Sequence, residues 1–345
     1  MICGGAHVEA PADPSVEMPV PADADLAAVP VPVSVPVSVA GAPTVQVSID
    51  PGAGDAVAAW LTDHDWIDEP VQRAFLEVVR PGHRVLDLGS HLGLFSLSAA
   101  ASGAAVLAVD ANAEHTRLLS HAARRNGFDD LHVANVALAD GGEGAEVVRF
   151  VPRSIHGHVL GPGETDAAAV EVPSTTVDRL LDDLGWDHLD VVKMDIEGSE
   201  MAALRGMARL FDRGCRPAVV IESNAAMLGL QGSSVPALRG ILVDLGYELL
   251  LIDHLRPGVL VETSVDAVQT ESASDLLAVV DRPDGLEERW RVEGPLTRTR
   301  IVTRILDAAA SPAAGYRLHS AGLLRDGPSW LHDAGAVGPA LVALD

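Results

Sequence analysis

Short apolar runs alternate with stretches of helical periodicity between residues 84 and 280, and this order constrains the fold more than any other feature. Strands separated by helices pair in parallel, because each helix returns the chain to the same edge of the sheet. We therefore predict a doubly wound α/β sheet that is mostly parallel and has an antiparallel closing strand. The expected strands are Arg84–Asp87, Ala105–Val109, His132–Val136, Val191–Met194, Ala218–Ile221, Glu248–Ile252 and Leu276–Val280.

Residues 1–43 are rich in proline, which recurs at even spacing in the valine-rich repeat at 29–39. Proline has no N–H to donate to a sheet ladder, so this spacing indicates disorder or polyproline II rather than a strand. We exclude 1–43 from the fold as a disordered tail. One domain is expected over 44–280, opening with a strand at 44–49 and followed by a helix at 69–79.

Residues 281–345 differ in composition, because their charges nearly balance. After Gly294 and Pro295, apolar residues between Leu296 and Leu306 recur at helical spacing, with three arginines on the opposite side. The sequence predicts a C-terminal helical extension, which could be a cap over the active site, a dimer arm or a surface helix. A homodimer formed through this extension is one expectation.

The balance of charge excludes several classes of partner. With 49 acidic against 24 basic residues, the formal net charge is -25. Such a chain repels phosphate backbones and anionic lipids, so we expect a small-molecule partner and neither nucleic acid nor membrane. The apolar runs fall short of the ~20 residues of a membrane helix, and no signal peptide is evident, so a cytoplasmic location is expected.

A strand that ends in an acid runs through glycines into a helix at Val85–Gly93. Gly89 and Gly93 allow a ligand to approach the backbone, and the following helix presents free N–H groups. A dinucleotide fingerprint would need glycines where His91 and Leu94 stand, which disfavours a nicotinamide cofactor. The pattern of Asp87, Gly89 and Gly93 instead resembles the first motif of class I S-adenosylmethionine-dependent methyltransferases.

The next two strands also end in polar residues. Asp110 stands where one carboxylate could accept both donors of a ribose diol, although adenosyl and dinucleotide cofactors share that geometry. Asp110 could equally cap the next helix, together with Asn112. Asn135, after the third strand, is a weaker candidate for the adenine side.

Lys193, the only lysine in the chain, precedes Asp195 by two residues on a strand, so both should face the same side. Asp195 ends a central strand, where open α/β sheets bind their ligands, and is our best candidate for an active-site acid. Glu197 and Glu200 follow in the turn and at the start of the next helix, where acids also favour the helix dipole.

The segments at 176–181 and 190–200 together resemble the FkbM family of methyltransferases. The family's threonine-leucine-aspartate helix appears with Val177 in place of leucine, and its Lys-x-Asp-x-Glu-Gly-x-Glu strand end matches in full. The resemblance covers about 69–280. It implies a class I, Rossmann-like methyltransferase domain over 44–280, with S-adenosylmethionine as the cofactor and a hydroxyl of a small natural product as the acceptor. The implied cofactor-binding residues are Glu69, Asp87, Gly89, Ser90, His91, Gly93, Asp110, Asn112 and Asn135.

Methyl transfer from a sulfonium needs mainly alignment of the attacking oxygen and removal of its proton. Asp195, the loop residues His156 and His158, and His91 are the candidates for the base, and Lys193 is placed beside them. Substrate contacts are expected from three acceptor side chains at strand ends and turns, namely Glu197, Glu222 and Asn224. Asp195, Glu222 and Asn224 could also supply oxygen ligands to Mg²⁺, but a metal is not required.

The sequence thus predicts a methyltransferase that forms an O-methyl product on a sugar or polyketide. Two alternatives stay open. One is a nicotinamide-dependent oxidoreductase on the same fold. The other is a non-catalytic module that binds the cofactor and recruits a partner through 281–345.

Overall fold

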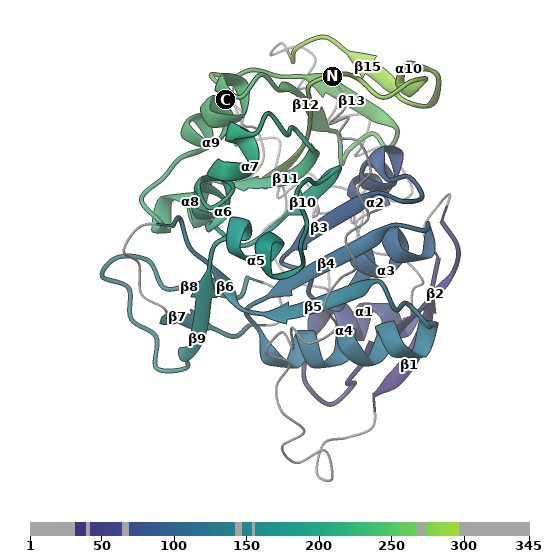
Figure 1. The fold of residues 1–345 in the computed structure, drawn as a ribbon, viewed down its shortest axis with the longest axis vertical. Coiled ribbons are helices and arrows are strands. Elements are labelled where there is room, and N and C mark those ends of the chain that lie inside the picture. Colours follow the sequence, from purple (N-terminus) through teal and green to yellow (C-terminus); the bar gives the residue numbers. More distant parts are fainter. Residues whose placement is uncertain are drawn as a thin grey trace, which may run out of the picture.

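A nine-stranded mixed sheet forms the centre of the protein in the computed structural model, which describes residues 32–38, 42–63, 69–141, 147–153, 156–267 and 273–296 (Figure 1). Its strand order is β15-β13-β12-β14-β11-β10-β3-β4-β5. The strands are β3 (Arg84–Leu88), β4 (Ala105–Asp110), β5 (Leu131–Asn135), β10 (Val191–Met194), β11 (Ala218–Asn224), β12 (Glu248–Ile252), β13 (Val259–Glu262), β14 (Ala273–Val279) and β15 (Arg291–Glu293).

The parallel part of this sheet confirms the predicted α/β class. β3, β4, β5, β10 and β11 pair in parallel, and β14 runs antiparallel to both β11 and β12. The chain moves outward from β3 to β5 and then returns to β10 on the other side of β3. The order of the strands therefore reverses between β3 and β10, and open α/β sheets bind their ligands in the crevice at such a point. This is the doubly wound, Rossmann-like sheet with an antiparallel strand that the sequence resemblance implies.

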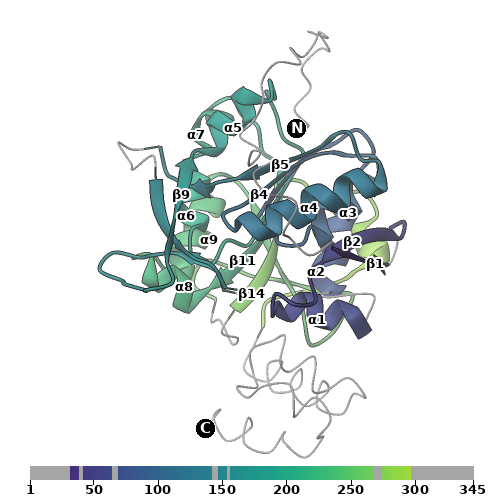
Figure 2. The same ribbon diagram turned by 90° about the horizontal axis from the view of Figure 1, so that it is seen from below.

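Helices cover both faces of the sheet (Figure 2). Alternate strand residues enter two separate cores, as Val85 and Leu86 show, because successive strand side chains point to opposite faces. One face carries α2 (Glu69–Val78), α3 (Leu94–Ala101) and α4 (Ala113–Asn126). The other face carries α5 (Val177–Asp183), α6 (Glu200–Arg205), α7 (Ala208–Asp212), α8 (Ala225–Leu230) and α9 (Val235–Asp244).

A second, four-stranded sheet lies between β5 and β10 in the sequence, and its strands were not predicted. It orders as β6-β9-β7-β8, from β6 (Ala137–Leu138), β7 (Val147–Val151), β8 (His158–Val159) and β9 (Val170–Thr175). Phe150 of β7 is buried and packs with Ala137 and Val172. The small sheet is the element that closes one side of the site described below.

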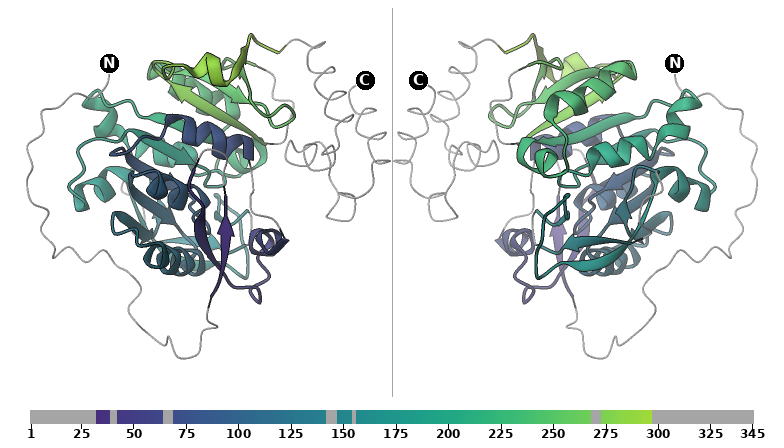
Figure 3. Two further views of the ribbon diagram at one scale, coloured as in Figure 1. Left: turned by 90° about the vertical axis from the view of Figure 1, so that its right-hand side faces the viewer. Right: turned by 90° about the vertical axis from the view of Figure 1, so that its left-hand side faces the viewer.

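The exclusion of the whole proline-rich segment from the fold is wrong for residues 33–37. β1 (Val33–Val37) pairs antiparallel with β2 (Val45–Ile49), beside α1 (Ala56–Asp63) and apart from the main sheet (Figure 3). Pro36 lies opposite Gln46, whose N–H and C=O are bonded to the side chain of Asn126 instead. The missing N–H of Pro36 therefore costs no ladder bond, which is where a strand tolerates proline.

Part of the expected C-terminal extension belongs to the main sheet. β15 pairs in parallel with β13, and the short helix α10 (Leu286–Arg289) precedes it. Trp290 between them is buried in the core. The helix expected from Leu296 onward, and any dimer contact through it, lies outside the described residues. Among the helices of the described ranges, none is long and apolar enough to cross a membrane.

Candidate active site

A cavity of about 220 Å³ opens where β3 and β10 end. The turn after β3, the turn after β10 and the loop of the small sheet all contribute to it. Its polar and charged lining residues are Ser90, His91, Asp110, His115, Arg153, His156, Lys193, Asp195 and Glu197. A smaller cavity of about 50 Å³ continues from it and shares Gly89, Asp110, Phe150 and Gly157.

Gly89 and Gly93 shape the turn at the mouth of this cavity. Both have positive φ, 76° and 85°, which side chains rarely adopt. A Cβ at Gly89 would lie 1.8 Å from the carbonyl oxygen of Asp195, and one at Gly93 would lie 2.1 Å from Leu119 Cδ1. Glycine therefore lets the turn after β3 approach the end of β10 and pack onto α4.

Asp110 holds this turn from the neighbouring strand. Its Oδ2 accepts a hydrogen bond from the backbone N–H of His91 at 2.8 Å, and its Oδ1 accepts from Asn112 N at 2.7 Å. Burial raises the pKa of Asp110. The hydrogen bond to His115, the charge of His115 and the hydrogen bond from Asn112 N outweigh burial and hold this pKa below its ordinary value. The carboxylate is therefore ionised and lines the cavity.

Lys193 lies buried beneath the cavity, between two carboxylates. Its Nζ donates to Gly89 O at 3.1 Å and lies 3.4 Å from Asp195 Oδ2 and 3.9 Å from Asp87 Oδ1. Burial lowers the pKa of Lys193, but the charges of Asp195 and Asp87 raise it by more, so the net pKa lies above its ordinary value and the side chain stays an ammonium. As predicted from the strand period, Lys193 and Asp195 face the same side. The Asp195 side chain stays 40% exposed at the cavity.

The turn after β10 brings Glu197 to the loop histidine. Glu197 has a φ of 50°, and its Oε1 lies 2.8 Å from His156 Nδ1. This contact raises the pKa of His156, although burial opposes it. Glu200 folds back instead, accepting from Ile196 N and Gly198 N, and its burial raises its pKa to about 7.

Glu222, at the end of β11, joins Asp195 and Glu197 in a cluster whose oxygens lie within 4.8 Å of one another. Burial and the charges of Asp195 and Glu197 raise the pKa of Glu222 well above its ordinary value, which favours a protonated carboxyl. Asn224 does not join them, because its Oδ1 caps α8 by accepting from Ala226 N. The predicted ligand set for Mg²⁺ is therefore not assembled, and Glu197 occupies the place expected of Asn224.

Several predicted site residues support the cavity from outside it. Asp87 is fully buried and accepts a hydrogen bond from Ser96. Asn112 caps α4, and Asn135 Nδ2 donates to Asp110 O. His158 faces the smaller cavity, with Nε2 at 2.9 Å from Glu164 Oε1. Glu69 begins α2, but its side chain lies outside the described part of the chain.

Other lining residues were not predicted. Phe150 and Arg153 come from the small sheet, and His115 comes from α4. Asp55, just before α1, touches His91 and His115. No local pattern marks these residues, because each is brought to the site by a tertiary contact; only the strand-like spacing of 147–151 could have suggested the position of Phe150.

The cavity fits the S-adenosylmethionine that the sequence resemblance implies. Asp110 retains lone pairs that can accept from a ribose diol. Ser90 Oγ is buried and, within the described ranges, has no hydrogen-bond partner, so it can bond to a ligand. A sulfonium cation would meet a cavity wall that carries the carboxylates of Asp195 and Glu197.

Several solved structures similar to this chain carry methyltransferase titles. An O-methyltransferase from Bacillus cereus in complex with SAH has 14% identity and a TM-score of 0.36, with 65% of this chain and 86% of that chain covered. An rRNA methylase from Streptococcus thermophilus has 11% identity and a TM-score of 0.36, with 62% of this chain and 96% of that chain covered. A SAM-dependent methyltransferase from Aquifex aeolicus has 12% identity and a TM-score of 0.33, with 62% of this chain and 90% of that chain covered. At these values the likeness says nothing of substrate or mechanism.

No curated protein matches the chain. The family model described as Methyltransferase FkbM domain matches residues 87–249, a range that runs from Asp87 of the glycine turn through β10 to the start of β12. The resemblance read from the sequence is thereby confirmed, and the nicotinamide alternative is set aside. Residues 87–249 are a methyltransferase FkbM domain, and the chain is an S-adenosylmethionine-dependent methyltransferase.

Proposed function

We propose that this methyltransferase moves the methyl group to a hydroxyl oxygen of a small natural product such as a sugar or a polyketide. Oxygen as the acceptor is what the resemblance to the FkbM family implies. The observation that supports it is the convergence of Asp195 with the paired side chains of His156 and Glu197 on the cavity beside the glycine turn. These groups can orient an O–H and take its proton.

The cofactor supplies a methyl group already activated by its sulfonium. Asp195, whose Oδ2 lies 3.4 Å from Lys193 Nζ, accepts a hydrogen bond from a neighbouring hydroxyl of the acceptor and so aligns the attacking oxygen. His156 Nδ1 is held by Glu197 Oε1, so His156 Nε2 takes the hydroxyl proton as the new C–O bond forms. Glu222, favoured in its protonated form, lies behind Asp195 and Glu197 and can donate a hydrogen bond to one of these carboxylates.

The direct test uses S-adenosylmethionine carrying a ¹³C-methyl group with a panel of hydroxylated sugars and polyketides and their amine analogues. We expect a ¹³C O-methyl product with at least one hydroxylated compound, identified by NMR, and none with its amine analogue. Methylation of nitrogen or carbon in place of oxygen would overturn the proposed acceptor. Absence of transfer to the whole panel, with S-adenosylhomocysteine still bound, would instead favour the non-catalytic alternative.

The pair formed by His156 and Glu197 predicts the pH dependence of turnover. A base must be neutral, and Glu197 raises the pKa of His156, so kcat should fall as the pH drops through that raised pKa and reach a plateau above it. In Glu197→Gln the carboxylate is gone, the pKa returns toward its ordinary value near 6.5, and the midpoint should move to lower pH. Steady-state kcat between pH 5 and 9 measures both midpoints.

Glu164→Gln is the matched control, since Glu164 contacts the other loop imidazole, His158, in the same way. Its profile should keep the midpoint of the wild type. A rate that stays flat between pH 5 and 9 in the wild type would contradict the role of His156 as the base.

A further inference from the structure

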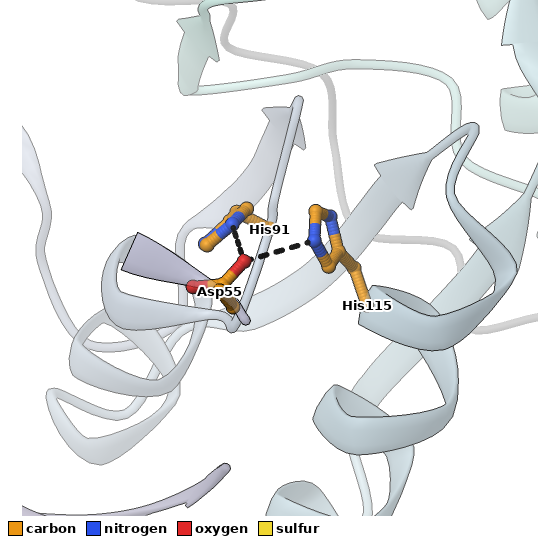
Figure 4. Close-up of side chains that lie close together, drawn as sticks. All are labelled: Asp55, His91 and His115. Atoms are coloured by element: carbon orange, nitrogen blue, oxygen red, sulfur yellow. Dashed lines mark hydrogen bonds and ion pairs between the residues drawn. The ribbon is translucent and has the colours of Figure 1, made fainter. Parts of the chain in front are cut away.

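Asp55, His91 and His115 form a cluster beside the cavity, and the function proposed above makes no use of it (Figure 4). Asp55 Oδ2 lies 3.1 Å from His91 Nε2 and 3.6 Å from His115 Nε2. Figure 4 shows one carboxylate oxygen of Asp55 linked by dashed lines to both rings, whose centroids are 4.0 Å apart. One potential ligand atom from each residue lies within 4.8 Å of the others. Three donors from distant parts of the chain thus converge on one point.

The chemistry of these donors favours a transition metal. Two imidazole nitrogens and one carboxylate oxygen are ligands of Zn²⁺ and of other first-row divalent ions, whereas Mg²⁺ and Ca²⁺ prefer oxygen alone. The acidic cluster of Asp195, Glu197 and Glu222 offers only oxygen and differs in this respect. The histidine cluster is therefore the better candidate for a softer ion.

The surrounding contacts already orient two of the three donors. Asp55 Oδ1 accepts a hydrogen bond from Ala58 N at 2.8 Å, which directs Oδ2 toward the histidines. His115 Nδ1 lies 3.6 Å from Asp110 Oδ1, while its Nε2 lies 3.6 Å from Asp55 Oδ2 and 3.3 Å from Asn112 Nδ2. A carboxylate behind an imidazole is the arrangement that fixes the ring of a metal-binding histidine. His115 is buried, so its ring has little freedom to turn away.

The third donor is aimed by the backbone. His91 has a φ of 48°, an uncommon value for a residue with a side chain, and its N–H is tied to Asp110 Oδ2 at 2.8 Å. Asp110 thus contacts both histidine residues, His91 through its backbone and His115 through its ring. A metal ion would connect the start of α1 to the glycine turn and to α4.

We propose that Asp55 Oδ2, His91 Nε2 and His115 Nε2 bind one divalent first-row transition metal ion, of which Zn²⁺ is the representative, next to the cofactor cavity. Three protein ligands leave at least one coordination position for water or another ligand. Asp55 lies outside residues 87–249. The site therefore joins a segment beyond the matched domain to the turn that the domain uses for its cofactor.

The test measures metal binding by the full chain and does not depend on activity. The protein is freed of metal with a chelator, titrated with Co²⁺ followed by visible d–d absorption, and then titrated with Zn²⁺. We expect one Co²⁺ per chain, displaced by Zn²⁺, and one Zn²⁺ per chain by mass spectrometry after dialysis. Asp55→Asn and His91→Asn should each weaken Zn²⁺ binding by on the order of 100-fold.

His132→Asn and Glu222→Gln are the controls, because His132 packs against Trp186 away from the cluster and Glu222 belongs to the acidic cluster. Both should bind Co²⁺ as the wild type does. Substoichiometric Co²⁺ in the wild type, or unchanged affinity in Asp55→Asn and His91→Asn, would overturn the proposal and leave an ion-pair network only. Thermal unfolding followed by circular dichroism establishes that each variant is folded, and two ligand variants keep the test decisive if one is not.

Discussion

Replacing Asp110 by asparagine is expected to weaken the binding of S-adenosylhomocysteine by on the order of 100-fold. A carboxylate that accepts two hydroxyl donors of a ribose loses about 3 kcal/mol when it becomes a neutral amide, and each 1.4 kcal/mol is tenfold in affinity. Asp110 lines both cavities, and hydrogen bonds and the charge of His115 keep its pKa low, so the wild type presents a charged acceptor. Isothermal titration calorimetry measures the two dissociation constants.

The control for Asp110→Asn must separate the loss of a ligand contact from the loss of a structural one, because Asp110 also accepts from His91 N and Asn112 N. Asp190→Asn is suitable. Asp190 Oδ2 accepts a backbone bond from Arg84 N at 2.8 Å at the opposite end of β3. Asp190→Asn should bind S-adenosylhomocysteine as the wild type does. If Asp110→Asn bound it within about twofold of the wild type, Asp110 would not contact the cofactor.

All strands of the main sheet except β13 and β15 were predictable, because they are buried on both faces and read as continuous apolar runs between helical segments. Leu249 and Leu250 of β12, for example, enter different cores, so residues 249–252 are apolar on both faces of the sheet. The small sheet lacks this property. Its strands are short and partly polar, and apolar residues such as Val147 and Val170 are exposed. A sequence pattern therefore does not distinguish these strands from loops.

Pro36 shows a different limit. Proline is excluded from a strand only where the ladder needs its N–H. Here Gln46, the residue opposite Pro36, bonds to the side chain of Asn126, so the ladder needs no N–H at position 36. Asn126 lies 80 residues from Gln46 in the sequence. A contact of this range has no local signature, so the hairpin of β1 and β2 could not be predicted from the repeat.

The candidate site divides in the same way. Asp195 and Lys193 were predicted because a strand period of two and the end of a central strand are local facts. Asp55 and His115 were missed, because α1 and α4 reach the glycine turn only through the tertiary fold. The capping role of Asn224 was missed, because a strand end is also a helix start and its amide oxygen caps α8.

Replacing Asp195 by asparagine is expected to lower kcat on the order of 1,000-fold while S-adenosylhomocysteine binds with nearly unchanged affinity. The amide keeps the size of the side chain but loses the charged acceptor that aligns the hydroxyl, and alignment and proton removal together contribute on the order of 100- to 10,000-fold. Single-turnover rates with an acceptor found in the ¹³C-methyl panel, compared with calorimetric cofactor affinity, separate the two effects.

The position of Asp195 makes this separation possible. Its carboxylate is 40% exposed at the cavity, and its backbone oxygen, which the substitution leaves in place, is what contacts the glycine turn. Asp190→Asn, at the other end of β10, controls for loss of charge near the same strand and should retain kcat. A loss of cofactor affinity equal to the loss of kcat would place Asp195 on the cofactor rather than on the acceptor. A kcat within threefold of the wild type would show that Asp195 takes no part in the reaction. No other described carboxylate could replace it, because none is both exposed at the cavity and paired with Lys193.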